Sequence, residues 1–310
     1  MSSARQSRAA LDAIGFCDTL SLVDEIAALL SSPMMTAVAA VFGVVWGSFF
    51  NVCIARIPAG LSIVRPGSRC GSCGVPIRPS DNIPVVSYLL LRGRCRACKQ
   101  PFSGRYPLVE ALSGLIAAAL WITFVAGDPG EAVAIRIARF AVYFAFSGVL
   151  IVLSFIDFAT MRLPDVITLP AIPIFFLSGF ATHHEAWLHR LIGAAAGYLF
   201  LRIIADFYYY VLKREGLGLG DAKLLALIGA LLGWRALLFV LMIGPLAGVL
   251  ISGPIVIWSR RRQPAAAAAD EPLRHVQIPF GPFLAGAALL YVFLAPRLSA
   301  IAPQFAFMNG

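Results

Sequence analysis

The sequence predicts an all-α protein that crosses a membrane about eight times and carries a small zinc-ribbon-like insertion between its first two spans. Of the 310 residues, 59% are hydrophobic and only 13% are charged. The mean hydropathy of +0.83 is far above that of a soluble domain. The apolar residues form runs of membrane-spanning length, and two Cys-x-x-Cys pairs stand in the polar segment between the first two runs.

Uninterrupted apolar stretches predict the spans. Because a bilayer offers no hydrogen-bond partners to the backbone, each stretch is expected to be a helix. The fourth and sixth stretches are short. The eight stretches are Met34–Ile54, Pro107–Phe124, Ile135–Ile156, Val166–Ala181, Leu188–Tyr210, Ala222–Gly233, Leu237–Trp258 and Ile278–Leu294.

This pattern divides the chain into four parts. We expect an N-terminal tail (1–33), a first span (34–56), a cysteine-rich module (57–106) and a membrane-embedded domain (107–310). The tail has no basic start, apolar centre and small-residue cleavage site, so no removable signal peptide is expected. The alanine-rich segment after the seventh span is expected to be a flexible or weakly helical connector.

Basic residues predict the orientation, because Lys and Arg accumulate in cytoplasmic loops. The segment from Arg56 to Tyr106 carries nine Lys or Arg residues and a single acid, Asp81. The segments "DFATMRLPD", "LKREGLGLGD" and "SRRRQPAAAAADEPLRH" are assigned to the same cytoplasmic face, and "GDPGEA" and "THHEAW" to the other. The net charge of +9 is therefore a topology signal, and no nucleic-acid partner is expected.

The Cys-x-x-Cys pairs predict a metal site. Cys70 and Cys73 precede Cys95 and Cys98 by about twenty-five residues, a spacing that lets two tight turns bring four thiolates to one tetrahedral Zn²⁺. A site with four cysteine ligands has no open position, so the metal would be structural, and its binding would contribute to folding. Disulfides or redox chemistry are the alternative, which a reducing cytoplasmic location disfavours.

Two aspartates are predicted at the same membrane boundary. Asp157 directly follows the third span, and Asp221 follows a glycine-rich segment just before the sixth. Ionisable groups at such positions are usually functional. Two adjacent carboxyl groups would share a proton, one acting as general base on water and the other as general acid. Gly216, Gly218 and Gly220 would allow a substrate strand to approach closely.

Other interpretations of these residues stay open. Asp221 is also explained as a residue in the first turn of a helix, favoured by the helix dipole. Asp157 is also explained by a surface ion pair with Arg162. Asp165 fits a helix cap better than catalysis, and Lys223 fits an interfacial lysine close enough to tune Asp221. Phosphate binding is disfavoured because the glycine spacing matches no phosphate loop.

The ordered set of motifs resembles the type IV prepilin peptidases, within the broader set of G-x-G-D intramembrane aspartyl proteases. In that resemblance, Asp157 and Asp221 match the two catalytic aspartates, and the four cysteines match the cytoplasmic zinc module. The stretches that carry it are "GSFFNVCIARIP", the two cysteine pairs, "SGRYPLVEALSG", "IDFATMRLPDVITLP", "GLGDAKL" and "IPFGPFLAG".

The resemblance implies a bacterial inner-membrane enzyme with its active site facing the cytoplasm. It implies cleavage of leader peptides from prepilins or pseudopilins and, because the cysteines are present, N-methylation of the new terminus with S-adenosylmethionine. No motif identifies the methyl-donor site, and Gly47–Pro58 with the cysteine loop is the region suggested. The substrate's identity, the oligomeric state and the separation of the two aspartates stay open.

Two other classes of membrane protein are the alternatives. An ion-coupled transporter would place its acids near the bilayer midplane, whereas these two lie at one boundary. A membrane thiol oxidoreductase would place its cysteine pairs on the oxidising side. A purely structural assembly protein would not require the paired acids.

Overall fold

The computed structural model describes residues 25–128, 130–182, 186–213, 218–262 and 279–301. Within these ranges the chain is helical and contains no strand, and its only β-type pairings are two isolated bridges in the cysteine module. The all-α fold class is therefore confirmed. Most of the N-terminal tail, the alanine-rich connector and the last residues lie outside the described ranges, as do Cys17 and Gly216.

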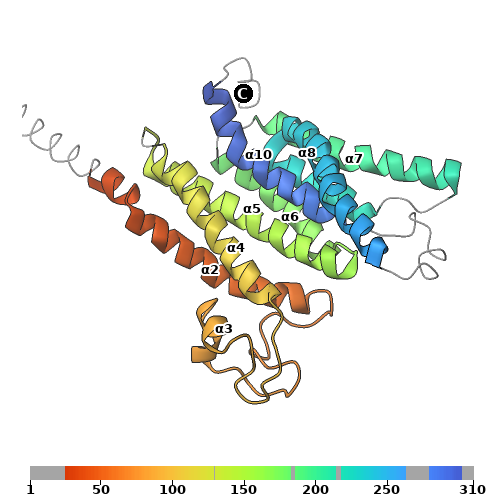
Figure 1. The fold of residues 1–310 in the computed structure, drawn as a ribbon. Coiled ribbons are helices and arrows are strands. Elements are labelled where there is room, and N and C mark those ends of the chain that lie inside the picture. The colour runs from red at the N-terminus through yellow and green to blue at the C-terminus, as the bar shows by residue number, and fades with distance from the viewer. Residues whose placement is uncertain (1–24, 129, 183–185, 214–217, 263–278, 302–310) are drawn as a thin grey trace, which may run out of the picture.

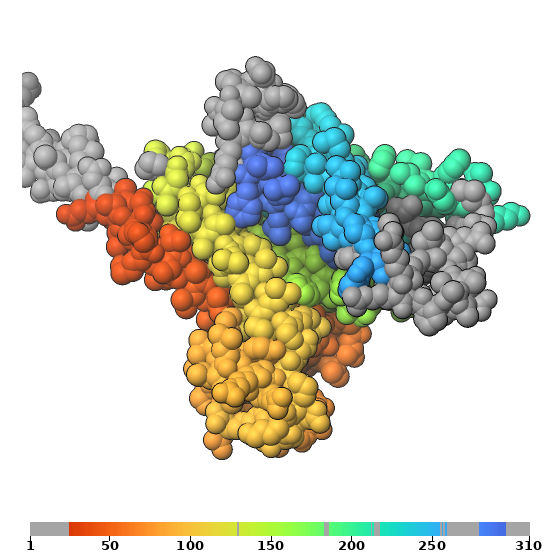
Figure 2. Space-filling view, in the orientation of Figure 1, coloured from red at the N-terminus to blue at the C-terminus, as the bar shows by residue number. Residues whose placement is uncertain are grey.

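The helices form one bundle, and the cysteine module (residues 57–106) projects from one end of it (Figures 1 and 2). The module contains only a short 3₁₀ turn, η1 (Pro79–Asn82), and a short helix, α3 (Val86–Leu90). The bundle helices are α2 (Pro33–Arg56), α4 (Arg105–Leu120), α5 (Val133–Thr160), α6 (Asp165–Ser178), α7 (Trp187–Leu212), α8 (Leu219–Arg262) and α10 (Gly281–Ile301).

Six helices in the described ranges are long and apolar enough to cross a membrane, and Gly281–Ala295 of α10 is a shorter apolar segment. The second of the six continues from α4 through the π-helical turn η2 (Trp121–Ala126), and the fourth continues from α6 through the 3₁₀ turn η3 (Gly179–Ala181). The described residues of the first seven predicted stretches lie in these elements, and the eighth does so from Gly281 onwards, where α10 begins. The sixth and seventh stretches both belong to α8, which is broken at Gly233 (φ 78°, ψ 175°).

Local sequence explains where α2 begins. Ser32 is its N-cap, and the Ser32 hydroxyl accepts a hydrogen bond from the Met35 N–H at 3.3 Å. Pro33 follows at the first helical position, where its missing N–H costs nothing. Small residues then allow α2 and α4 to approach closely: a Cβ on Gly47 would stand 2.7 Å from the Glu110 Cα. Such contacts between small residues are the usual means of helix packing in membranes.

The centre of the bundle is formed by α5 and the first half of α8. Large apolar side chains of both are fully enclosed, among them Phe146, Leu150 and Leu153 on α5 and Leu225 and Ile228 on α8. α5 contacts α2, α4, α6 and α10, while α8 packs on α6, α7 and α10. This core fixes the end of α5 and the start of α8, where the two aspartates lie.

Candidate active site and metal centre

Asp157 lies in the last turn of α5. The helix ends at Met161, whose left-handed backbone (φ 52°) lets its N–H donate to the Asp157 carbonyl at 2.8 Å. The Asp157 side chain is buried, and its Oδ2 accepts a hydrogen bond from the Gly281 N–H at 3.0 Å. Asp157 and Arg162 are both described and form no ion pair, so the surface-pair explanation of Asp157 is wrong.

Asp221 lies in the first turn of α8, and its N–H donates to the Gly218 carbonyl at 3.1 Å. Gly220 precedes it and packs against Leu163, whose side chain would stand 3.0 Å from a Cβ at that position. This close approach joins the start of α8 to the turn between α5 and α6. The glycines at 218 and 220 thus bring Asp221 next to the segment that follows Asp157.

The two acids line one cavity of about 370 Å³. Much of its wall is formed by Met161, Arg162, Leu163 and residues 218–220. The structure therefore brings the two predicted residues together in one cavity. Two carboxyl groups in a partly enclosed cavity cannot easily both be ionised, and an arrangement that shares a proton can activate water and protonate a leaving amine.

Asp165 and Lys223 also line this cavity and form an ion pair. The Lys223 Nζ donates to the Asp165 Oδ1 at 2.5 Å. The predicted capping role of Asp165 is wrong, because Pro164 is the N-cap of α6 and Asp165 follows it in the first turn without a capping bond. Lys223 lies two residues after Asp221 on α8, and its ammonium group is thus engaged by Asp165 of α6.

Gly281 was not predicted to contribute to the site. It is the first residue of α10, and its N–H is the hydrogen-bond donor to Asp157. A Cβ at this position would stand 2.7 Å from the Asp157 Oδ2, so only glycine fits here without displacing the carboxylate. The sequence did hold a signal, because a glycine stands between Phe280 and Pro282 near the start of the last apolar stretch. This glycine has no local role as a turn.

The four predicted cysteines lie together in the module. The Sγ atoms of Cys70, Cys73, Cys95 and Cys98 are all within 4.8 Å of one another, and none is in a disulfide. The Sγ atoms of Cys70 and Cys98 are 3.8 Å apart. A tetrahedron with metal–sulfur bonds of about 2.3 Å has edges of roughly 3.8 Å, so the cluster has the dimensions of a four-thiolate site.

The two cysteine pairs have the same backbone structure. Cys70 and Cys95 each donate an N–H to a carbonyl five residues later and accept one from an N–H four residues later, at 2.9–3.0 Å. The fourth residue after each, Gly74 or Lys99, has a left-handed backbone with φ of 70° or 59°. The N–H groups of Cys73 and Ser72 lower the pKa of the Cys70 thiol to about 6, which favours the thiolate that metal binding requires.

Comparison with known proteins matches both parts of the chain. Residues 41–124 match the family model described as "Bacterial Peptidase A24 N-terminal domain", and residues 144–253 match "Type IV leader peptidase family". No solved structure matches the chain.

Curated relatives match over most of their length. The chain is 38% identical to a "Prepilin leader peptidase/N-methyltransferase" of Burkholderia pseudomallei (strain 1026b), over 85% of this chain and 87% of the relative. Proteins of the same name from Myxococcus xanthus (strain DK1622) and Aeromonas hydrophila are 38% and 36% identical, over 77% and 79% of this chain and 69% and 85% of theirs. With its apolar helices, the chain is a multi-pass inner-membrane protein, and it belongs to the type IV leader peptidase family.

Proposed function

We propose that this protein cleaves the leader peptides of type IV prepilins or pseudopilins and methylates the new N-terminus. Its relatives are named for both activities. The observation that carries the proposal is the cavity that Asp157 and Asp221 line together, in a chain of this family. The transporter and thiol-oxidoreductase alternatives are not favoured, because neither explains paired acids at one boundary in a chain with these relatives.

The proposed chemistry is that of an aspartic peptidase. One carboxylate removes a proton from water while the water oxygen attacks the scissile carbonyl, and the other carboxylic acid hydrogen-bonds the carbonyl oxygen as it gains negative charge. The tetrahedral intermediate then collapses, the C–N bond breaks, and the leaving amine takes a proton from the pair. Water is the nucleophile, so no acyl-enzyme forms.

Gly281 positions one member of this pair. Its N–H is fixed by the start of α10 and holds Oδ2 of Asp157. This leaves the other oxygen of Asp157 to face water or Asp221. The Lys223–Asp165 pair occupies the same cavity and offers a charged wall to a substrate segment emerging from the membrane.

The cysteine cluster is proposed to hold a structural Zn²⁺. Its four thiolates would complete a closed tetrahedral site, which leaves the metal no position for a substrate or water. For methylation, bound S-adenosylmethionine supplies the methyl group to the deprotonated terminal amine and leaves as a neutral thioether. We place the cysteine module and the aspartate cavity at the cytoplasmic face of the inner membrane, on the strength of the basic residues between Arg56 and Tyr106.

Replacing either acid by its amide tests the peptidase assignment. Asp157→Asn and Asp221→Asn should each lower the cleavage rate of a purified prepilin by at least about 10³-fold, as expected for loss of a general acid or base. Asp206→Asn is the control, because Asp206 pairs with Arg202 on α7 and does not line the cavity. Mass spectrometry of the prepilin gives the cleaved fraction, and cleavage at the control rate by either amide variant contradicts the proposal.

A further inference from the structure

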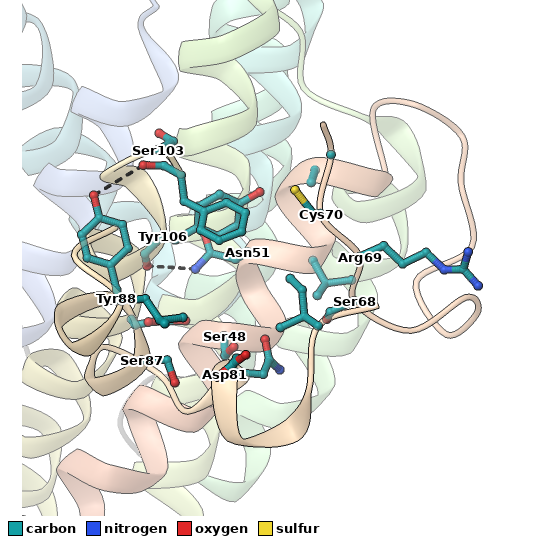
Figure 3. Close-up of a pocket in the computed structure, with 18 of the residues that line it drawn as sticks. Ser48, Asn51, Ser68, Arg69, Cys70, Asp81, Ser87, Tyr88, Ser103 and Tyr106 are labelled. Carbon is teal, nitrogen blue, oxygen red and sulfur yellow. Dashed lines mark hydrogen bonds between the residues drawn. The ribbon is translucent and has the colours of Figure 1, made fainter. Parts of the chain in front are cut away.

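A second cavity lies where α2 and α4 meet the cysteine module. Its volume is about 450 Å³, larger than that of the aspartate cavity and within the range of roughly 300–1,000 Å³ typical of small-molecule sites. Figure 3 shows residues of α2, α3, α4 and the module around it. Among those lining it are Ser48, Asn51, Arg56, Tyr88, Tyr106 and Glu110.

Asn51 lines this cavity and carries an unused hydrogen-bond acceptor. The residue is 3% exposed, and its Nδ2 donates to the Tyr106 carbonyl at 3.0 Å (Figure 3). Its Oδ1 is buried and has no hydrogen-bond partner. A buried amide oxygen without a partner is unfavourable, so its place in a cavity wall points to a ligand that donates a hydrogen bond to it.

Glu110 supplies a negative charge in the same wall. It is 7% exposed, and its Oε2 accepts the Val85 N–H at 2.7 Å. Glu110 and the basic residues near it are described, and no ion pair joins them. A buried carboxylate that lacks a cationic partner and lines a cavity favours a ligand that carries a positive charge.

The remaining wall suits an aromatic, zwitterionic ligand. Tyr88 and Tyr106 offer aromatic faces, on which an adenine ring or a sulfonium cation can lie. Arg69 lines the same cavity and is exposed, so its guanidinium group can meet a carboxylate at the mouth. Arg56 is half-buried in the wall, where its guanidinium group donates to the Ser62 and Gly67 carbonyls. Together, the Asn51 acceptor, the Glu110 carboxylate, the tyrosine rings and the Arg69 guanidinium match S-adenosylmethionine. That molecule carries an amine, a sulfonium, an adenine and a carboxylate.

The cavity lies towards the end of the bundle that carries the proposed peptidase site. The ring of Phe42 on α2 lies against Phe140 and Phe144 of α5, and Phe50, eight residues later, contacts Phe144 and Gly148. The two helices therefore run in the same direction. Asn51 and Arg56 follow Phe50 on α2, as Asp157 follows Gly148 on α5, so both cavities lie towards the same end.

We propose that this cavity binds S-adenosylmethionine, with the Oδ1 of Asn51 and the carboxylate of Glu110 as its buried recognition groups. This inference rests on the proposed methyltransferase function and assigns it a site. That site is separate from Asp157 and Asp221, so methyl-donor binding does not require the peptidase acids.

The first test measures binding of tritiated S-adenosylmethionine to the full-length protein in detergent by equilibrium dialysis. Asn51→Leu removes the free acceptor at similar volume, and Glu110→Gln removes the charge while keeping an acceptor for Val85. Each should weaken binding at least 10-fold. Cys53→Ala is the matched control, since Cys53 is buried on α2 two residues from Asn51 and does not line the cavity. Wild-type affinity in both cavity variants overturns the proposal.

A second measurement needs no variant and covers the case in which a substitution impairs folding. Ultraviolet crosslinking of tritiated S-adenosylmethionine to the wild-type protein, with S-adenosylhomocysteine as competitor, should label peptides that contain Tyr88 or Tyr106. If the label that the competitor removes lies only in other segments, the cavity assignment is overturned, although the protein still binds the methyl donor. A wild-type protein that cleaves prepilin yet neither binds the tritiated compound nor methylates its product instead contradicts the methyltransferase part of the proposed function.

Discussion

Gly281→Ala is the most specific perturbation of the proposed peptidase site that the structure offers. The added Cβ would stand 2.7 Å from the Asp157 Oδ2 and 3.3 Å from its Cγ, whereas ordinary contacts begin at 3.4 Å. The carboxylate must therefore retreat by roughly 0.7 Å, and the hydrogen bond from the Gly281 N–H is weakened or lost. The fold need not change, because alanine is a good helix former at the start of α10.

The rate effect follows from the geometry. A displacement of about 1 Å in a catalytic group can cost about 10²-fold in rate. Losing a hydrogen bond to a charged group costs about 1.5–3 kcal/mol, which corresponds to roughly 10- to 150-fold. We therefore expect kcat/KM for prepilin cleavage to fall by about 10- to 100-fold. The assay is steady-state cleavage of a purified prepilin in detergent, with product measured by mass spectrometry.

A control on the same helix separates this effect from a general change in α10. Gly286 is also helical, but a Cβ there would meet no atom within 4 Å. Gly286→Ala should cleave prepilin at the wild-type rate, and both variants should melt at similar temperatures. Wild-type cleavage by Gly281→Ala would refute the positioning role of Gly281, and an equal loss in both variants would assign the effect to the helix.

Three further predictions concern the cysteine module and the orientation. Cys70→Ser and Cys95→Ser should each lower the zinc content per chain measured by atomic spectrometry from about one to near zero, and an unchanged content would exclude the thiols as ligands. The Arg96 guanidinium hydrogen-bonds Asp81 at 2.6 Å and lowers its pKa, so this pair stabilises the fold above the ordinary aspartate pKa of about 3.9. Asp81→Asn should therefore lower the melting temperature at neutral pH, and the difference from wild type should shrink as pH falls below 3.9 and vanish below the lowered pKa; a difference independent of pH would contradict this. Ser80→Cys, at an exposed position of the module, should react with a membrane-impermeant maleimide only after the inner membrane is opened, and labelling in intact spheroplasts would reverse the proposed orientation.

Features set by neighbouring residues were predictable from the sequence. Span positions follow from local hydropathy, and the cysteine cluster follows from two tight turns of fixed spacing. The break in α8 was predicted only in part. The sequence indicated two spans separated by Trp234–Ala236, but the structure resumes the helix directly after the positive-φ Gly233, so the two predicted spans form one element.

Features that join distant segments were not predictable. The contact between Gly281 and Asp157 spans 124 residues, and that between Asn51 and Tyr106 spans 55. Each depends on which helices become neighbours and in which register, which hydropathy does not encode. Glu110 did give a local signal, since an acid inside an apolar stretch is costly unless it has a role, but only the structure shows the cavity that it lines.

The ends of four helices explain why this place in the fold suits two acids. α6, α8 and α10 begin there and α5 ends there: Asp165 and Asp221 stand in the first turns of α6 and α8, and Gly281 begins α10 against Asp157. The first N–H groups of a helix have no partner within it, and the helix dipole makes that end positive. Three such ends oppose the single negative end of α5.

This arrangement offsets the charge of the acids without a dedicated lysine, since Lys223 is paired with Asp165. The bundle therefore contributes to the proposed chemistry through the placement of its helix ends, and the backbone N–H of Gly281 is the part of that contribution that a single methyl group can remove.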